Sequence, residues 1–146
     1  MNERIAIIGG GIGGLCLAQG LRQAGARVTV YERDRTPADR LQGYRVHIDP
    51  NGAEALRTCL PPHLWQAFLD TTGTGGQDFA FVTEQMKLLA LIETPPDAGH
   101  YSVSRITLRQ VLLSGLDDVV RFGKRFERYE RLSDGRYELH FADGTR

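Results

Sequence analysis

The hydrophobic pattern of the first thirty residues switches from strand-like to helix-like and back. Residues 5–8 form an unbroken apolar run that suits a strand buried on both faces. Three apolar residues then recur at helical spacing: Leu15, Ala18 and Leu21. Gly25 supplies a helix stop, and Val28 and Val30 beyond it point to one side of a second strand. The pattern predicts a strand, a helix and a strand in succession.

The middle of the chain predicts three further helices, each with its own start signal. Asp49 is typical of an N-cap, because a proline follows at the first helical position. The double proline at 61–62 ends this helix and begins another. Ser104 is the expected N-cap of a helix that runs through Leu113.

Apolar or alternating runs predict the remaining strands. Residues 78–83 and 87–93 flank a four-residue turn, so they predict a hairpin. Residues 119–122 suit a third parallel strand beside the first two. Residues 125–132 and 136–141 alternate on either side of Ser-Asp-Gly, which predicts a second hairpin.

A glycine-rich turn separates the first strand from the first helix, with the spacing Gly9-x-Gly11-x-x-Gly14. Gly9 permits a tight turn, Gly11 lets a pyrophosphate approach bare backbone, and Gly14 lets the helix pack closely on the strand. The free N–H groups and the positive dipole end of the helix then face the anion. We therefore expect a dinucleotide site whose phosphate receptor is the backbone itself.

An acidic residue at the end of the second strand extends this site. Glu32 follows Gly14 by 18 residues, close to the offset of about 20 at which a carboxylate accepts hydrogen bonds from an adenosine ribose. A carboxylate would repel a 2′-phosphate, so NADP is disfavoured here, while FAD and NAD remain. The alternative is a glycine-tolerant βαβ unit that binds no nucleotide.

The turn belongs to a longer spaced pattern: Gly9, Gly11, Gly14, Ala18, Leu21, Gly25, Val28, Val30, Glu32 and Arg33. This pattern resembles the N-terminus of FAD-dependent monooxygenases of the aromatic hydroxylase type, the family of p-hydroxybenzoate hydroxylase. The resemblance implies an α/β fold, with a Rossmann-like FAD-binding domain built from a parallel sheet and an antiparallel β crossover. It also implies FAD contacts from Ile12, Gly13 and Arg33, in addition to the glycines and Glu32.

Residues 43–52 extend the resemblance to the family stretch whose arginine, here Arg45, contacts the FAD phosphates. Arg45 lies just upstream of a predicted helix, where it can reach an anion on the first turn. From the residues alone, a surface arginine paired with Asp49 or Glu54 is the alternative.

A third segment, Ser104-Arg105-x3-Arg109, resembles the family motif that opens a helix beside the cofactor. Arg105 and Arg109 stand four residues apart on one helix face, where like charges repel. They therefore either face solvent or share an anionic partner, and the resemblance favours the cofactor.

Composition narrows the classes of partner. Lys plus Arg and Asp plus Glu both number 18, and this zero net charge gives no sign of nucleic-acid binding. No apolar run approaches the roughly 18 residues that cross a bilayer, and residues 1–8 lack signal-peptide features, so a cytoplasmic protein is expected. Cys16 and Cys59 are expected as buried apolar residues, and the four scattered histidines suggest no metal site.

The resemblance also implies a division of the chain. Residues 1–73 and 102–146 match the FAD-binding domain, and residues 74–101 match a β hairpin contributed to the substrate domain. The family pattern continues beyond the turn at Asp143 with further fingerprints. We therefore expect an N-terminal fragment that needs the C-terminal part of the same enzyme.

For the parent enzyme, the resemblance implies hydroxylation of a small aromatic or polycyclic substrate with NADH or NADPH and O2. No side chain of this chain is assigned as acid, base or nucleophile, and the chain alone is expected to be inactive. The alternatives are a non-catalytic FAD- or nucleotide-binding fragment, an FAD-dependent dehydrogenase and a flavin halogenase.

Overall fold

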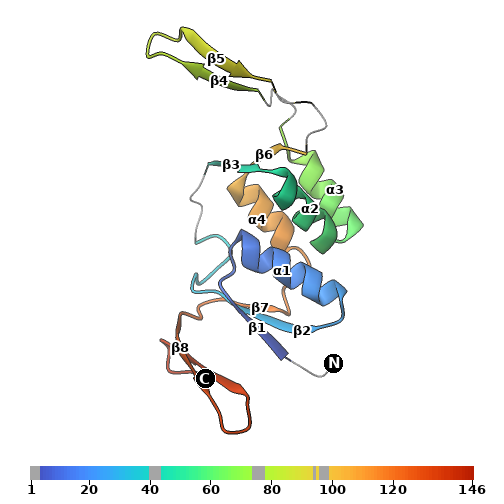
Figure 1. Cartoon of the computed structure of the whole chain (residues 1–146). Coiled ribbons are helices and arrows are strands. Elements are labelled where there is room, and N and C mark those ends of the chain that lie inside the picture. The colour runs from blue at the N-terminus through green and yellow to red at the C-terminus, as the bar shows by residue number, and fades with distance from the viewer. Residues whose placement is uncertain (1–3, 40–43, 74–77, 94, 96–98) are drawn as a thin grey trace.

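The structure is a computed structural model that describes residues 4–39, 44–73, 78–93, 95 and 99–146. At its centre is a parallel sheet with the strand order β1 (Arg4–Ile8), β2 (Arg27–Tyr31) and β7 (Val120–Arg121) (Figure 1). Ile7 of β1 pairs with Val30 of β2, which in turn pairs with Val120 of β7. The expected strand–helix–strand unit and the third parallel strand are confirmed.

The described residues form helices α1 (Ile12–Gln23), α2 (Pro50–Cys59), α3 (Pro62–Asp70) and α4 (Arg105–Leu113), all on one side of this sheet (Figure 1). The expected caps are present. The Asp49 carboxylate accepts a hydrogen bond from the Gly52 N–H at 2.7 Å, and the Ser104 hydroxyl accepts one from the Thr107 N–H at 3.4 Å. None of the described helices is long and apolar enough to cross a membrane.

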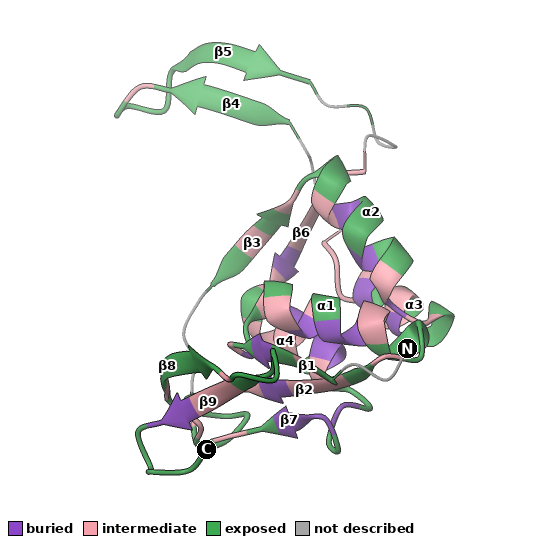
Figure 2. Ribbon diagram, turned by 60° about the horizontal axis from the view of Figure 1, so that its bottom comes forward, coloured by how far each residue is buried: buried purple, intermediate pink, exposed green. Residues whose placement is uncertain are grey.

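The core lies where the helices meet each other and the near face of the sheet. Leu15 and Ala18 of α1, Phe68 of α3, and Leu108 and Leu112 of α4 are all 0% exposed. Burial of these apolar side chains supplies the main driving force for folding. In Figure 2 the buried positions of the helices face one another and the sheet.

The first strand departs from the expectation of burial on both faces. Ile7 is 7% exposed, but the next residue, Ile8, is 46% exposed. Side chains alternate between the two faces of a strand. Ile7 faces α1, because a Cβ on Gly14 would lie 3.3 Å from its Cγ2, and the described helices lie on this side of the sheet (Figure 1). The prediction is therefore wrong for the second face of β1.

The two cysteines are free and half-buried, not fully buried as expected. They lie close together across α1 and α2, where a Cβ on Gly20 would come within 2.8 Å of Cys59 Sγ. Burial, with a smaller effect of Cys59, raises the pKa of the Cys16 thiol to about 12. The thiol of Cys16 is therefore protonated at neutral pH.

A two-stranded antiparallel sheet that the sequence did not predict joins β3 (Arg45–Ile48) to β6 (Tyr101–Ser104). Arg45 was expected just upstream of a helix and lies there, in β3 before α2, but the pairing of this strand with β6 was not expected. Arg45 lies opposite Ser104 in this pairing, so β6 runs directly into α4. The pairing also crosses the expected domain boundary between residues 101 and 102, a division that remains a prediction.

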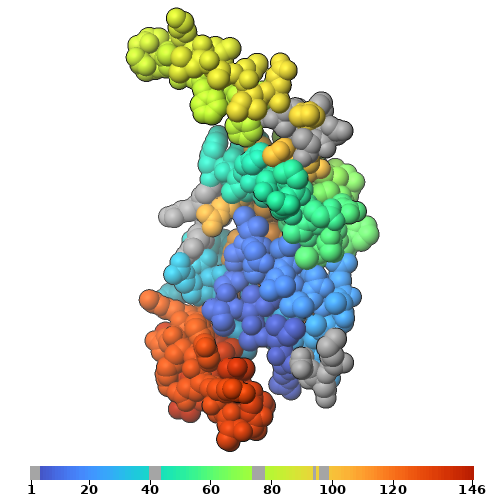
Figure 3. All heavy atoms as spheres, in the orientation of Figure 1, coloured from blue at the N-terminus to red at the C-terminus, as the bar shows by residue number. Residues whose placement is uncertain are grey.

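Both expected hairpins are confirmed: β4 (Phe79–Val82) with β5 (Leu88–Ile92), and β8 (Phe126–Arg131) with β9 (Tyr137–Phe141). Every residue of β4 and β5 is exposed, and this hairpin projects from one end of the molecule (Figure 2, Figure 3). The predictions for residues 43–52 and 74–101 fall partly outside the described residues, at residue 43, residues 74–77, residue 94 and residues 96–98.

Candidate functional site

The glycine turn lies at the carboxyl end of β1, where α1 begins. Gly9 has a φ of 103°, which favours glycine, and its N–H donates a 2.8 Å hydrogen bond to the Tyr31 carbonyl. A Cβ on Gly14 would lie 2.1 Å from the Gly9 carbonyl oxygen, so the helix can approach the strand only with glycine there. The expected turn and packing roles of these two glycines agree with this geometry.

Gly11 differs from both, because a Cβ at this position would meet nothing within 4 Å. Its φ of −80° and ψ of −177° are ordinary extended values, so neither backbone strain nor packing within the described residues requires a glycine. The open space beside Gly11 is what a ligand pressed against the backbone needs.

The first turn of α1 supplies no acidic side chain to its own N-terminus. Gly11 is the N-cap and makes no side-chain cap hydrogen bond. The first main-chain hydrogen bond of the helix runs from the Leu15 N–H to the Gly11 carbonyl at 3.0 Å. Helix N-termini of this kind favour anions, because their free N–H groups and the positive end of the helix dipole both face a ligand bound there.

Glu32 lies against the glycine turn, with 7% of its surface exposed. One carboxylate oxygen accepts a 2.6 Å hydrogen bond from the Gly10 N–H, and the other accepts a 2.9 Å bond from the Asp34 N–H. The carboxylate thus joins the turn to the segment after β2. Each oxygen keeps lone-pair capacity for a further donor.

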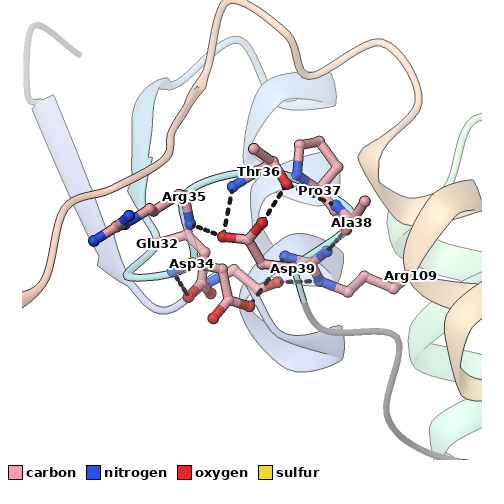
Figure 4. Close-up of polar contacts among 9 residues, drawn as sticks. Glu32, Asp34, Arg35, Thr36, Pro37, Ala38, Asp39 and Arg109 are labelled. Atoms are coloured by element: carbon pink, nitrogen blue, oxygen red, sulfur yellow. Dashed lines mark hydrogen bonds and ion pairs between the residues drawn. The ribbon is translucent and has the colours of Figure 1, made fainter.

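The segment after β2 is ordered by hydrogen bonds of its own (Figure 4). The Asp39 carboxylate accepts bonds from the Arg35 N–H at 2.7 Å and from the Thr36 hydroxyl at 2.6 Å. The Thr36 hydroxyl, followed by the Arg35 N–H, lowers the pKa of Asp39. The loop beside Glu32 is therefore shaped by contacts within the protein, while Arg33 next to Glu32 is exposed.

Arg109 of α4 reaches the glycine turn from 99 residues away in sequence. Its Nε donates to the Gly10 carbonyl at 3.1 Å and its Nη1 to the Pro37 carbonyl at 2.8 Å, while Nη2 lies 3.9 Å from Asp34 Oδ2. The side chain is only 13% exposed, so the solvent-facing alternative does not hold for Arg109. The guanidinium binds the turn and the loop together, and a contact with a cofactor stays a prediction.

The structure leaves Arg45 exposed on β3, close to Gly73, where an added Cβ would come within 3.2 Å of its Nη1. Neither alternative partner is paired with it. Glu54 binds Arg57 at 2.8 Å, and Asp49 caps α2. Arg45 therefore remains a candidate for an anionic ligand.

Arg105 is also exposed, at the first position of α4. Its backbone N–H donates to the Tyr44 carbonyl at 3.1 Å, which ties the start of α4 to the residue before β3. The structure therefore gathers Gly10, Glu32 and Arg109 into one contact network. Arg45 and Arg105 lie near each other on β3 and α4, apart from that network.

Sequence reasoning missed Gly10, Asp34, Pro37 and Asp39 as parts of this site. Gly10 carries a signal in the sequence, because it stands in a run of three glycines. The structure gives the reason for a glycine there, since a Cβ would lie 3.0 Å from Glu32 Oε2. Thr36 and Asp39 also carry a signal in the sequence, because both are turn-forming residue types and they stand three residues apart. The carbonyl of Pro37 has no such signal, because Arg109 reaches it from a distant helix.

Comparison with known proteins gives this geometry a context. Residues 7–72 match the family model of the NAD(P)-binding Rossmann-like domain. The dual O-methyltransferase/FAD-dependent monooxygenase elcB of Phaeosphaeria nodorum is 32% identical over 142 residues, which span 89% of this chain and 15% of that protein. The 3-amino-4-hydroxybenzoate 2-monooxygenase PtmB3 of Streptomyces platensis is 35% identical over 150 residues, which span 99% of this chain and 37% of that protein.

A solved structure shows the same fold. The crystal structure assigned as an FAD-containing monooxygenase from Photorhabdus luminescens subsp. laumondii matches with a TM-score of 0.84 and 41% identity, over 97% of this chain and 36% of that one. The chain therefore spans less than half the length of each of these relatives. The similarity covers the glycine turn, Glu32 and α4 together.

Proposed function

Since the chain is homologous to FAD-dependent monooxygenases and shares their Rossmann-like domain, we propose that it forms the part of such an enzyme that binds the ADP moiety of FAD. The observation that carries this proposal is the open space beside Gly11 at the N-terminus of α1, whose first turn contains no acidic residue. The pyrophosphate would lie there, against the N–H groups that begin α1 at Ile12 and Gly13.

Glu32 is proposed to hold the adenosine ribose. Its buried carboxylate is fixed by Gly10 and Asp34, and the remaining lone pairs can accept hydrogen bonds from ribose hydroxyls. A carboxylate already held in place loses little freedom when a ligand binds. The same negative charge disfavours a ribose 2′-phosphate.

Four arginines are proposed to complete the cofactor site: Arg33, Arg45, Arg105 and Arg109. Arg45 and Arg105 are exposed, and their charge suits the phosphates of FAD. Arg109 acts at the turn itself, because its guanidinium holds the Gly10 carbonyl and keeps the backbone in its anion-binding shape. A direct contact from Arg109 to the cofactor stays a prediction, because its Nη2 is buried and lies 3.9 Å from Asp34 Oδ2.

The activity proposed for the whole enzyme is hydroxylation of a small aromatic substrate with NADH or NADPH and O2. The relative from Streptomyces platensis is named for an amino-hydroxybenzoate, which supports an aromatic substrate. The flavin supplies the redox chemistry when bound. The role proposed for this chain is to hold and orient FAD. Residues 74–101, which include the exposed β4–β5 hairpin, are proposed to contribute to the substrate region.

A flavin titration of the chain tests the cofactor proposal. We expect FAD to bind more tightly than riboflavin, because riboflavin lacks the ADP moiety that this site would hold. Gly11→Val is expected to abolish the FAD preference without loss of thermal stability, since a Cβ there meets nothing within 4 Å and the backbone at Gly11 is extended. Equal binding of FAD and riboflavin, or unchanged FAD affinity in Gly11→Val, would contradict the proposal.

The alternatives differ in the activity of the complete enzyme. A hydroxylase consumes O2 with NAD(P)H, and a phenol stimulates that consumption. A dehydrogenase, a halogenase or a non-catalytic FAD-binding protein gives no such stimulation over a broad panel of phenols.

The two free cysteines suit the reducing cytoplasm that we propose as the location of this protein.

A further inference from the structure

One face of the β8–β9 hairpin gathers ionisable side chains that the proposed flavin site does not use. Glu130 lies directly opposite Glu138 in the pairing of the two strands, and Arg128 lies opposite His140. Glu138 and His140 are two residues apart on β9, so both side chains point to the same face. Two carboxylates in directly opposed positions repel each other and need a compensating positive charge.

The contact geometry centres on His140. Its Nε2 lies 3.1 Å from Glu138 Oε1 and 3.5 Å from Glu130 Oε1, and one ligand atom from each of the three residues lies within 4.8 Å of the others. The His140 side chain is 8% exposed, yet Nε2 makes no hydrogen bond of acceptable geometry within the described part of the chain. A buried nitrogen that faces two carboxylates without such a bond calls for a physical explanation.

We propose that Glu130, Glu138 and His140 form a binding site for one divalent metal ion of the zinc class. Tetrahedral Zn²⁺ with ligands at about 2.0–2.1 Å places neighbouring ligand atoms about 3.3 Å apart, and the two histidine–carboxylate distances of 3.1 and 3.5 Å bracket that value. A neutral imidazole and two carboxylates are ordinary zinc ligands, and their charges balance those of the ion. Water would complete the coordination.

The surroundings of the site orient its ligands. Arg128 donates to Glu130 Oε1 from Nε at 3.2 Å and from Nη2 at 2.9 Å. Arg146 Nη1 lies 3.7 Å from Glu138 Oε1. Partners that hold a ligating carboxylate in place are a regular feature of metal sites.

Protonation of His140 is the competing explanation for its position between two carboxylates. An imidazolium would satisfy the charges without a metal. The two explanations differ in the amount of zinc that the chain binds. A metal site binds one Zn²⁺ per chain, whereas a protonated histidine binds none.

The test is a titration of ZnCl₂ into the 146-residue chain near neutral pH, with a fluorescent zinc chelator as competitor. It is run in a His47→Asn background, because His47 Nε2 lies 2.9 Å from His100 Nδ1 and this pair offers a second place for zinc. We expect one bound ion per chain. Glu138→Gln and His140→Asn are each expected to weaken binding by at least about tenfold, which is the scale of effect for groups that support a metal site.

Glu127→Gln and His63→Asn are the matched controls, because both residues are exposed and lie outside the cluster. They are expected to leave zinc affinity unchanged. Glu138→Gln keeps the proposal testable if His140→Asn fails to fold, because Glu138 is only partly buried. Absence of zinc binding in the parent chain, or an unchanged affinity in folded Glu138→Gln, would overturn the metal site in favour of a protonated His140.

Discussion

The Gly10 N–H and the Glu32 carboxylate form a 2.6 Å hydrogen bond that joins the glycine turn to the end of β2. The bond spans 22 residues of sequence and is buried. The Glu32 carboxylate therefore has a structural role in the absence of ligand, because this hydrogen bond sets the shape of the glycine turn. A Cβ on Gly10 would press on the same carboxylate, so this contact needs a glycine at position 10 as well as a carboxylate at position 32.

Glu32→Gln is predicted to destabilise the chain in the absence of ligand. One end of the glutamine amide cannot accept from the Gly10 or Asp34 N–H, so at least one charge-assisted hydrogen bond is lost, at a cost of about 1.5–3 kcal/mol. Urea unfolding measures this change. Glu127→Gln, on the exposed face of β8, is the control. Equal stability of Glu32→Gln and the parent chain would mean that the carboxylate serves the ligand alone.

Gly14→Ala and Gly13→Ala are predicted to have opposite effects, although they are neighbours in α1. The added Cβ of Gly14→Ala would lie 2.1 Å from the Gly9 carbonyl oxygen, whereas that of Gly13→Ala meets nothing within 4 Å. We expect Gly14→Ala to lose at least about 1–3 kcal/mol through overpacking. Gly13→Ala should gain up to about 1 kcal/mol through helix propensity. Similar melting temperatures for the two variants would refute this account of the turn.

Arg109→Lys is predicted to loosen the loop at residues 34–39. A lysine keeps the charge but cannot bridge the Gly10 and Pro37 carbonyls together, so one charge-assisted hydrogen bond worth about 1.5–3 kcal/mol is lost. Hydrogen–deuterium exchange should become faster in this loop. Arg105→Lys, on the exposed part of the same helix, should leave the exchange rates unchanged. Equal exchange in both variants would argue against the bridge.

The turn that ends β9 is predicted to weaken in acid through Asp143. The Lys124 ammonium, 2.6 Å away, and then the Thr145 hydroxyl and N–H lower the pKa of this carboxyl below its usual 3.8. A depressed pKa in the folded state gives stability that is present above the unfolded value of about 3.9 and is lost as the pH falls through the folded value. The NMR signal of the Thr145 amide should follow this loss below about pH 4.

Asp143→Asn tests the same contact from the other side. It should remove that part of the acid dependence of stability, because an amide does not titrate. Asp117→Asn, at an exposed position after α4, is the matched control and should leave the acid profile unchanged. An acid profile that is the same in Asp143→Asn as in the parent chain would locate the responsible carboxyl elsewhere.

Local chemistry explains which parts of the fold were predictable from sequence. The unit from β1 to β2 follows from apolar spacing, glycine geometry and a helix stop, all within about 30 residues. The caps at Asp49 and Ser104 and both hairpins have equally local signals. The pairing of β3 with β6 has no local signal, because α2, α3 and the β4–β5 hairpin separate Arg45 from Ser104 in the sequence.

The candidate site divides in the same way. Glu32 and the glycines were predicted because a motif fixes their spacing. The role of Arg109 was not, because α4 must first pack beside α1 before its side chain reaches Gly10. The group of Glu130, Glu138 and His140 on the β8–β9 hairpin was equally hard to predict. The spacing in sequence places Glu138 and His140 on one face, but Glu130 joins them only through the register of the two strands.

The β4–β5 hairpin has a practical consequence for work with this chain. Phe79, Phe81, Leu88, Leu91 and Ile92 are each about half exposed or more, on strands of high β-propensity. Such strands associate readily in concentrated samples, so we expect the yield of monodisperse protein to fall as concentration rises. Lysine or glutamate at positions 81 and 91 would raise the working concentration without touching the glycine turn.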